Sequence, residues 1–513
     1  MRLFYTILVA LFVTQLAFAQ QQPAWSVIIY AATDEAELAE HADPILQNLL
    51  ENELPQEIEL LIEKDSLNEG ASRIIKQHSQ VLDIQPLEEP DSADPVHFKD
   101  FLTWAISHVQ GTKKMVIILA HSWGWKGIIQ DFFIPNQPEV NTMSRIREFA
   151  NAFKETNFTP DILFLDSCIL GNVEPIDELR AITRYIAVSQ RETPYSGILY
   201  SELLKILKDQ TLSAKETLSR LPELYVKAYS SGSAIIPTES DYPVITMAAL
   251  DLNLWEEFKN NFTSLVQSLK SSGFRDFLKQ HPTWQEKFAD EDSNVDLVTL
   301  LREILKISTD NTVKLKINEI LWRLGFSGQN NNEINKLLTI PKNNYFKFKI
   351  PILSLKASKK LKETFIKQFK EQNQDIELPQ NLKFHLRTLN KKTFFIIIGF
   401  AEKNYKLRPW LPGVKSFKLQ LTNLKEKKTT RNFSIEQDYY VRRDFPSTSF
   451  LVSEAHSQGA PFINSIGIFL KPLMDENEVR ATDPITGLKG PAYYLNLPWN
   501  QSTGWGELTL LNR

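Results

Sequence analysis

The feature that most constrains the fold is a series of short apolar runs that alternate with amphipathic helical patterns between residues 25 and 250. Short runs of this kind, rich in Val, Ile and Leu and bounded by turn residues, predict buried β-strands. Strands separated by helices predict a mostly parallel sheet with helices on both faces, so we expect an α/β fold. The predicted strands cover 25–32, 58–62, 115–120, 162–165, 185–189 and 243–250.

The periodicity of the chain changes twice, which indicates more than one domain. Helices are predicted at 34–51, 98–109, 143–153, 173–179 and 200–207, with a polar, acidic loop near Pro86 and Pro90. Helical periodicity then dominates from 254 to about 337, and short strands such as 346–350, 393–399 and 417–422 follow. Because 513 residues exceed one hydrophobic core, we expect a 20–253 α/β domain, a 254–340 helical region and a 341–513 β-rich C-terminal domain.

Composition excludes few classes of protein. With 42% hydrophobic and 23% charged residues the chain is an ordinary globular protein, and its net charge of −4 gives no overall attraction to nucleic acid or anionic membrane. Residues 341–440, however, contain 22 Lys and Arg against 8 Asp and Glu. Two interpretations are open for this basic region: a solvated lysine-rich surface, which is the commoner case, or a polyanion-binding patch. No nucleic-acid-binding motif is present, so we expect no nucleic-acid partner.

The N-terminus reads as a targeting segment. A positive start at Arg2 precedes an apolar stretch over 3–18, and Ala17-Phe18-Ala19 is a small-x-small cleavage site. We therefore expect a signal peptide at 1–19 and export to a periplasm or to the extracellular space. No later run approaches the ~20 apolar residues of a membrane span.

Two strand ends carry residues suited to nucleophilic catalysis. Cys168, the only cysteine of the chain, follows the predicted strand 162–165, and His121 follows the predicted strand 115–120. Groups just past the carboxyl ends of parallel strands face the crevice where ligands bind. A thiol and an imidazole placed there are what thiol catalysis requires. A lone cysteine forms no internal disulfide, and a buried, inert thiol is the open alternative.

These segments resemble the clostripain family of cysteine peptidases, which belongs to the caspase-like clan. The resemblance runs in order from about residue 25 to 254, through WSVIIYAATDEAEL, HFKDFLTWAISH, MVIILAHSWGW, DILFLDSCILGNVEPIDELR, RYIAVSQRE and YPVITMAALDLNLW. It implies a caspase-like α/β sandwich. It also implies a cysteine endopeptidase that acts on a protein or peptide substrate through a Cys-His dyad and an acyl-enzyme.

The resemblance assigns roles to individual residues. His121 matches the catalytic histidine, Cys168 the nucleophile, and Asp166 an acid near the pocket for the side chain that precedes the scissile bond. The backbone N–H groups of Ser122 and Cys168 are expected to form the oxyanion hole. The chain departs from the family at Ala120-His121-Ser122, where the family has Asp-His-Gly.

A second departure concerns the substrate pocket. The family preference for Arg or Lys before the cut rests on buried carboxylates that pair with a cation. Here Arg191 replaces one carboxylate and Ser196 occupies the position of the loop acid, while Glu192 is available as a substitute. Asp166, Glu192 and Ser196 are therefore the predicted substrate-binding residues, and the preference for a basic residue is left open.

The leading hypothesis is an exported cysteine endopeptidase, and the alternative is a catalytically impaired caspase-like scaffold that acts as a binding module. The other histidines show no metal-ligand spacing and no EF-hand loop is present, so we expect no metal or cofactor, while calcium dependence stays open. The oligomeric state is also open. Some members of the family cut themselves between the histidine and cysteine strands, an interval that here contains Lys126, Arg145, Arg147 and Lys154.

Overall fold

The computed structural model describes residues 22–133, 142–230, 245–287 and 293–326. Further along the chain it describes 338–340, 342–352, 362–363, 365–366, 369–370, 378–379, 381–389, 392–407, 417–423, 429–435, 439–443, 445–457, 466–472, 474, 482 and 487–511. The predicted signal peptide at 1–19 lies outside these residues. Among the helices described, none is both long and apolar enough to cross a membrane.

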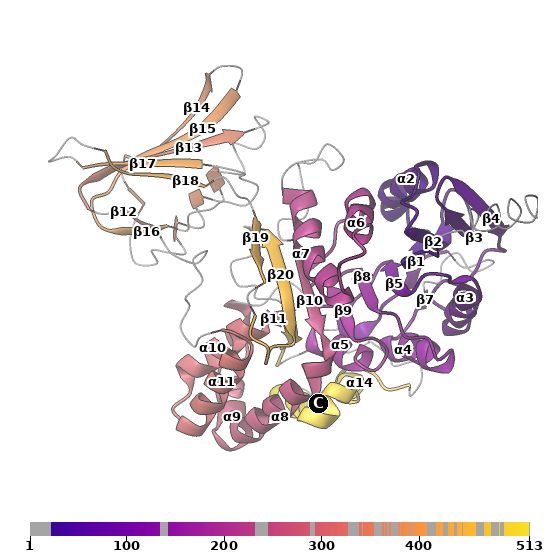
Figure 1. Cartoon of the computed structure of the whole chain (residues 1–513). Coiled ribbons are helices and arrows are strands. Elements are labelled where there is room, and N and C mark those ends of the chain that lie inside the picture. Colours follow the sequence, from indigo (N-terminus) through magenta and orange to yellow (C-terminus); the bar gives the residue numbers. More distant parts are fainter. Residues whose placement is uncertain are drawn as a thin grey trace, which may run out of the picture.

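A ten-stranded sheet forms the centre of the molecule, in the order β19-β20-β10-β9-β8-β5-β1-β2-β3-β4 (Figure 1). Its middle five strands run parallel to one another. They are β1 (Trp25–Thr33), β2 (Ile58–Ser66), β5 (Lys113–Leu119), β8 (Ile162–Asp166) and β9 (Tyr185–Val188). The predicted α/β fold with a mostly parallel sheet is confirmed, and each of these strands overlaps a predicted one.

The strands toward both edges of the sheet pair antiparallel with their neighbours. Beyond β2 the chain forms a hairpin of β3 (Ser72–Gln77) and β4 (Gln80–Pro86), where we expected a polar loop that reaches Pro86. The loop begins only after β4, because the chain first forms this hairpin. β4 is an exposed edge strand, and its apolar residues Val81, Leu82 and Ile84 face solvent instead of a core. At the other margin, β10 (Thr246–Asp251) runs antiparallel to β9.

Helices cover both faces of the sheet, as the alternation predicted. The helices α2 (Ala36–Glu51), α6 (Tyr200–Leu207) and α7 (Ala214–Ser230) pack on one face, and α3 (Pro95–His108), α4 (Ile146–Glu155) and α5 (Val173–Leu179) pack on the other. Alternate residues of a strand point to opposite faces, so Ile29 belongs to the first core and Ile28 to the second. The helix α7 is an addition that the sequence analysis did not predict.

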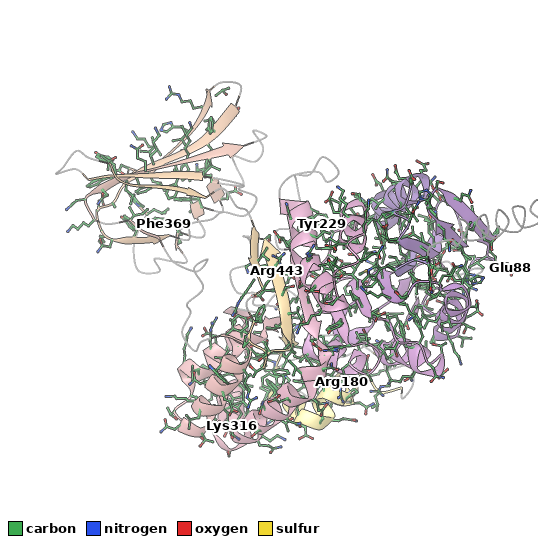
Figure 2. All side chains as sticks on the ribbon, viewed as in Figure 1. Glu88, Arg180, Tyr229, Lys316, Phe369 and Arg443 are labelled. Atoms are coloured by element: carbon green, nitrogen blue, oxygen red, sulfur yellow. The ribbon has the colours of Figure 1, made fainter. Side chains whose placement is uncertain are left out.

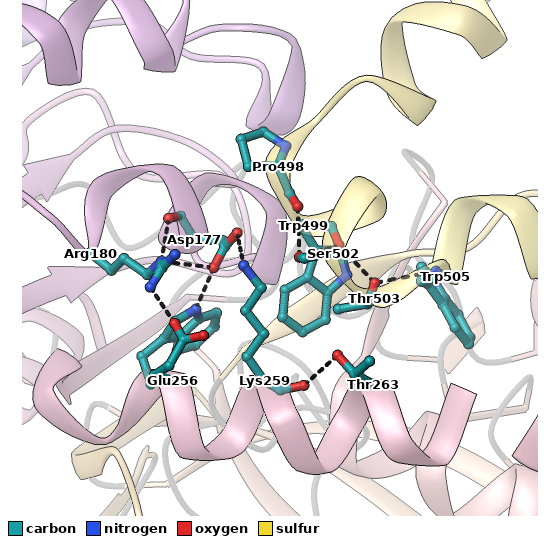
Figure 3. A network of polar contacts seen from close by, with 11 residues as sticks. Asp177, Arg180, Glu256, Lys259, Thr263, Pro498, Trp499, Ser502, Thr503 and Trp505 are labelled. Carbon is teal, nitrogen blue, oxygen red and sulfur yellow. Dashed lines mark hydrogen bonds and ion pairs between the residues drawn. The ribbon is translucent and has the colours of Figure 1, made fainter. Parts of the chain in front are cut away.

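A helical segment extends the layer that contains α5. It comprises α8 (Trp255–Ser271), α9 (Phe274–Gln280), α10 (Leu297–Ile307) and α11 (Asn311–Arg323). Asp177 on α5 accepts hydrogen bonds from Lys259 Nζ at 2.8 Å and Trp255 Nε1 at 2.9 Å, both on α8 (Figure 3). The Asp177 carboxylate and the Lys259 ammonium are almost fully buried. Separating them would leave an unpaired buried charge, so this pair fixes α8 against α5.

A second sheet has its own core. Its strand order is β14-β15-β13-β17-β18, and all its pairings are antiparallel. The strands are β13 (Asn344–Ile352), β14 (Lys383–Leu389), β15 (Lys392–Phe400), β17 (Phe417–Asn423) and β18 (Thr429–Ile435). Phe346, Phe348 and Phe395 pack against Phe365 and Phe369 in this core. Figure 2 labels Phe369 among the side chains of this unit. Figure 1 shows the sheet set apart from the ten-stranded sheet.

The chain then returns to the main body, which divides the expected 341–513 domain. The strands β19 (Tyr439–Arg442) and β20 (Leu451–Ser457) extend the central sheet beyond β10. The strand β21 (Gly467–Phe469) pairs with β11 (Asn294–Asp296). The short helices α14 (Gly490–Leu495), α15 (Pro498–Thr503) and α16 (Trp505–Thr509) pack near α5 and α8. Pairings between segments this far apart in the sequence leave no local pattern, so the extent of the β-rich domain was overestimated.

Candidate active site

The strands β5 and β8 bring His121 and Cys168 to one edge of the sheet. Leu119 at the end of β5 lies opposite Asp166 at the end of β8. His121 and Cys168 therefore each stand two residues beyond the same paired position. The Ser122 hydroxyl donates a hydrogen bond of 2.5 Å to the carbonyl oxygen of Cys168 and ties the two loops together. A glycine at position 122, as in the family pattern, would lack this link.

The thiol of Cys168 is held by Thr193. The backbone N–H of Thr193 donates to Sγ at 3.3 Å, and its hydroxyl oxygen lies 3.5 Å from Sγ. Burial raises the pKa of the Cys168 thiol, the Thr193 hydrogen bonds act in the opposite direction, and the charges of Glu192 and Asp166 add to the rise. The net direction is upward, so the thiol is predominantly protonated at neutral pH. The sequence analysis missed Thr193.

The imidazole of His121 lies between aromatic rings and near a carboxylate. Its ring centroid is 5.1 Å from that of Phe132 and 5.7 Å from that of Tyr195. Its Nε2 lies 3.4 Å from Glu35, which caps the N-terminus of α2. Although burial alone would raise the pKa of Glu35, hydrogen bonds from the α2 backbone and from His121 lower it. Between the described side chains of His121 and Cys168 there is no direct hydrogen bond.

The residue after the nucleophile has an unusual backbone conformation. Ile169 has a φ of 58°, which is strained for a β-branched residue. Its N–H donates to the carbonyl oxygen of Arg191 at 3.1 Å, and its own carbonyl accepts from Asn172 Nδ2 at 2.8 Å. The Ile169 side chain packs closely against Gly124: a Cβ at position 124 would lie 3.3 Å from Ile169 Cγ2. These neighbours enforce a sharp turn directly after Cys168 and so fix the direction of the thiol.

Two backbone donors remain available beside the thiol. Within the described residues, neither the N–H of Ser122 nor that of Cys168 donates a hydrogen bond to another protein group. Ser122 is not among the residues with a positive φ, so its backbone conformation does not require glycine. The replacement of the family's glycine by serine is therefore compatible with an oxyanion-binding role for this N–H.

Asp166 is buried beneath the loop that follows β9. Its carboxylate accepts hydrogen bonds from the Tyr225 hydroxyl at 2.9 Å and from the Ile198 N–H at 2.6 Å. Burial raises the pKa of Asp166 to about 7. Gly197 has a φ of 62°, and a Cβ there would lie 2.5 Å from the carboxylate, so only glycine fits. Asp166 does not cap α5, because Asn172 holds the cap position.

The other two predicted substrate-binding residues lie on the same loop. Glu192 is exposed, and its charge is close enough to Cys168 to raise the pKa of the thiol. Ser196 is half-buried in the turn that Gly197 closes by donating to the carbonyl oxygen of Pro194. Glu192 is thus the more solvent-accessible of the two acids, Asp166 and Glu192, near the thiol.

The tryptophans beside His121 have different environments. Trp125 is 4% exposed and packs against Phe469, Tyr493 and Tyr494. Trp123 is 47% exposed, and its Nε1 donates to Gln130 at 2.6 Å. Of these two tryptophans, only Trp123 therefore offers an exposed aromatic surface to a ligand near His121.

The C-terminal segment touches the loops after both candidate catalytic residues. Gly467 donates from its N–H to the carbonyl oxygen of Gly171 at 2.8 Å. Glu174 accepts hydrogen bonds from the Tyr494 hydroxyl at 2.8 Å and from the Phe469 N–H at 3.2 Å, and burial raises its pKa to about 7. On the other loop, the Tyr493 hydroxyl donates to the carbonyl oxygen of Trp125 at 3.2 Å.

A group of buried carboxyls lies near His121, on the β1 and β2 side. Asp131 accepts from the Ser92 N–H at 2.6 Å, and Asp65 accepts from the Ser92 hydroxyl at 2.7 Å. Desolvation, reinforced by the charge of Asp34, raises the pKa of Asp131 to about 8, and desolvation raises that of Asp65 to about 7. In the part of the chain that the structure describes, no group of three His, Cys, Asp or Glu residues is arranged to hold a metal ion.

The fold and this site define an α/β protein with a thiol and an imidazole at neighbouring strand ends. A model of the clostripain family matches residues 29–429. The chain belongs to the clostripain family of cysteine endopeptidases, and its central sheet has the mostly parallel α/β arrangement that we expected.

Solved structures of C11 cysteine proteases are similar to this chain. Two structures, each of a secreted C11 cysteine protease from Bacteroides thetaiotaomicron, show 18% and 15% identity over 58% and 59% of this chain. The first, in complex with an irreversible peptide inhibitor, is covered to 82% and has a TM-score of 0.44, and the second is covered to 85% and has a TM-score of 0.43. An inactive zymogen from Parabacteroides distasonis shows 15% identity over 59% of this chain and 82% of its own, with a TM-score of 0.42. A search of curated proteins gave no match.

Proposed function

We propose that this protein is an exported cysteine endopeptidase in which Cys168 is the nucleophile and His121 the general base. The observation that carries the proposal is their equivalent position, two residues beyond the paired ends of β5 and β8. The Ser122–Cys168 hydrogen bond holds the two loops in register. The basic start, apolar stretch and small-x-small site within residues 1–19 support export.

The proposed reaction proceeds through a thioester. His121 takes the thiol proton while Sγ attacks the peptide carbonyl carbon, and the N–H groups of Ser122 and Cys168 donate to the oxyanion. The intermediate collapses with cleavage of the C–N bond, and His121 returns the proton to the leaving amine. Water then gives a proton to His121 and attacks the thioester, which releases the acid and restores the thiol.

The raised pKa of Cys168 bears on the timing of proton transfer. Its burial favours a neutral thiol in the resting enzyme rather than a thiolate paired with an imidazolium. His121 Nε2 faces Glu35, and Sγ faces Thr193. We therefore propose that proton transfer accompanies attack on the bound substrate, since catalytic hydrogen bonds often form only in the substrate complex.

For the substrate pocket we propose a division of roles between the two acids. Both oxygens of Asp166 already accept protein hydrogen bonds, and a pKa of about 7 leaves it partly protonated, so it shapes the base of the pocket. Glu192 is exposed beside the thiol and is the carboxylate suited to pair with an Arg or Lys of the substrate.

Active-site labelling and turnover test the catalytic assignment. We expect Cys168→Ala and His121→Ala to remain folded by circular dichroism but to lose at least about a thousandfold in kcat/KM on peptide substrates. The wild type should be labelled on Cys168 by a peptidyl acyloxymethyl ketone. Equal turnover by Cys168→Ala would overturn the mechanism, and failure of basic, acidic and neutral probes would favour the catalytically impaired binding module.

Peptide-library profiling tests the pocket. We expect wild type to prefer Arg or Lys before the cut and Glu192→Gln to lose about tenfold or more of that preference while it retains neutral substrates. Glu202→Gln, which changes a half-buried acid on α6 that pairs with Lys205, is the control. An unchanged profile in Glu192→Gln would exclude Glu192 as the specificity acid.

A further inference from the structure

The sheet β14-β15-β13-β17-β18 has two chemically different faces. Directly paired residues of an antiparallel sheet lie on the same face. One face carries Phe346, Phe348 and Phe395, which pack on Phe365 and Phe369. The register places a second set of residues on the opposite side, which we call the outer face: Tyr345, Lys347, Lys349, Lys383, His385, Arg387, Phe394, Ile396, Ile398 and Phe400.

Cations flank a central apolar strand on this outer face. Ile398 of β15 lies between Lys383 of β14 and Lys347 of β13. Ile396 lies in the same way between His385 and Lys349, two residues further along. Strand spacing puts flanking residues about 10 Å apart across the sheet, and successive rows about 7 Å apart. The result is two parallel lines of basic side chains.

The strands of this sheet bring no negative charge to the outer face. None of the five strands contains an Asp or Glu. Lys347, Lys383, His385 and Arg387 are all exposed, and Lys349 is half-buried. A like-charged face of this kind attracts anions and is complementary to a chain of regularly spaced negative groups.

The apolar part of the outer face argues against a nucleic acid. Binding of single-stranded nucleic acid relies on open aromatic faces on which bases stack. Here the Lys349 ammonium lies 4.0 Å from the centroid of the Phe394 ring and covers it, and the residues between the cations are isoleucines. Tyr345, packed on Phe400 at 5.1 Å, is the strongly exposed aromatic at 47%. A single strongly exposed ring among the described outer-face residues suits a sugar at the end of the face but provides no stacking platform.

We propose that the outer face of this sheet binds an anionic polysaccharide, with its sulfate or carboxylate groups paired to the two cation lines. This inference is independent of the peptidase reaction, since none of its residues lies at the strand ends of His121 and Cys168. It gives the basic region of residues 341–440 a ligand and would hold the enzyme on an anionic polymer while the thiol site cleaves protein.

Binding of defined polymers to the full-length protein tests the proposal. The probes are a heparin dodecasaccharide (sulfated), hyaluronate of equal length (carboxylate only), neutral dextran and single-stranded oligothymidylate, each measured at several salt concentrations. We expect heparin or hyaluronate to bind and dextran not to bind, and the difference between the first two identifies the anion. Tighter binding of oligothymidylate, or no binding of either anionic polysaccharide, would overturn the proposal.

Paired variants locate the surface. Lys347→Gln/Lys349→Gln should weaken polysaccharide binding by about tenfold or more and reduce the slope of log affinity against log salt by about two, one for each cation removed. Lys342→Gln/Lys403→Gln removes two exposed turn lysines of the same unit and should leave affinity nearly unchanged. Equal losses in both variants would mean a diffuse charge effect and contradict a defined face. Both variants should keep the wild-type circular dichroism spectrum, which shows that they fold, and cleavage of a small peptide should be unaffected in both.

Discussion

At the scale of single residues, Thr193 is the hydrogen-bonding partner of the Cys168 thiol and influences its pKa. Its N–H and hydroxyl both lie within hydrogen-bonding distance of the Cys168 thiol. These contacts oppose the rise in the pKa of Cys168 that burial causes. The hydroxyl can be removed without changing the backbone donor, so its contribution can be measured separately.

We predict that Thr193→Val raises the pKa of the Cys168 thiol by about 0.5 to 1 unit, because the thiolate loses one stabilising hydrogen bond. The measurement is the rate of iodoacetamide alkylation as a function of pH. Cys168 is the single cysteine of the chain, so the titration has no background from other thiols. The acid limb of kcat/KM should shift by the same amount.

A matched variant for this experiment is Thr103→Val, which removes an exposed hydroxyl that bonds only within α3. It should titrate like the wild type. If Thr193→Val also titrates like the wild type, the hydroxyl does not stabilise the thiolate, and the backbone N–H alone carries that effect.

At the scale of elements, the segment from β21 to α14 braces the catalytic loops. Tyr494 and Phe469 donate to the buried Glu174 on α5, and Gly467 donates to Gly171 in the loop after the nucleophile. The strained turn at Ile169 persists only if its surroundings hold it. We infer that these contacts from the end of the chain help to maintain the direction of the thiol.

We predict that Tyr494→Phe lowers the free energy of unfolding by about 1 to 3 kcal/mol, since it removes a buried donor to Glu174. Because the loop of Cys168 loses part of its support, kcat should fall more than KM changes. Urea denaturation and steady-state kinetics on a peptide substrate provide the two measurements.

The variant Ser502→Ala serves as the control on the same segment, because among the described residues its hydroxyl bonds only to Pro498 and Trp499 within α15 (Figure 3). It should leave both quantities nearly unchanged. A loss of stability in Tyr494→Phe without any loss of kcat would show that the brace is structural and does not position the thiol.

At the scale of the whole molecule, several carboxyls are buried near the active-site edge of the sheet. Burial raises the pKa of Asp65, Asp166 and Glu174 to about 7 and that of Asp131 to about 8. In the unfolded chain these groups titrate near about pH 4. Between the pKa of these groups in the unfolded chain and their raised pKa in the folded protein, the folded protein therefore binds more protons than the unfolded chain.

The contribution of these groups to the free energy of unfolding should therefore be greatest at acidic pH, near their pKa in the unfolded chain. It should be lost as pH rises through about 7 to 8. We predict that Asp131→Asn, which mimics the protonated acid, decreases the slope of unfolding free energy against pH by the contribution of about one proton. Denaturant unfolding at a series of pH values measures this slope. Asp83→Asn on the exposed strand β4 is the control, and a slope that falls equally there would contradict the assignment to Asp131.

Local patterns in the sequence were sufficient for the parallel core. The apolar runs that became β1, β5 and β8 are buried on both faces, so their hydrophobicity is continuous and easy to read. The same patterns placed His121 and Cys168 past adjacent strand ends. The hairpin of β3 and β4 was missed because its outer strand is exposed along its whole length.

The sequence by itself determined the strand-and-helix alternation, the single thiol and the strand ends that carry the candidate dyad, because each depends on residues close together in the chain. Tertiary structure alone decided that Thr193 and Glu35 would be the partners of Cys168 and His121. It also decided that the last strands return to the central sheet and that Glu174 is braced by Tyr494. These contacts join segments remote in sequence, and their energy comes from burial and pairing that no local pattern encodes.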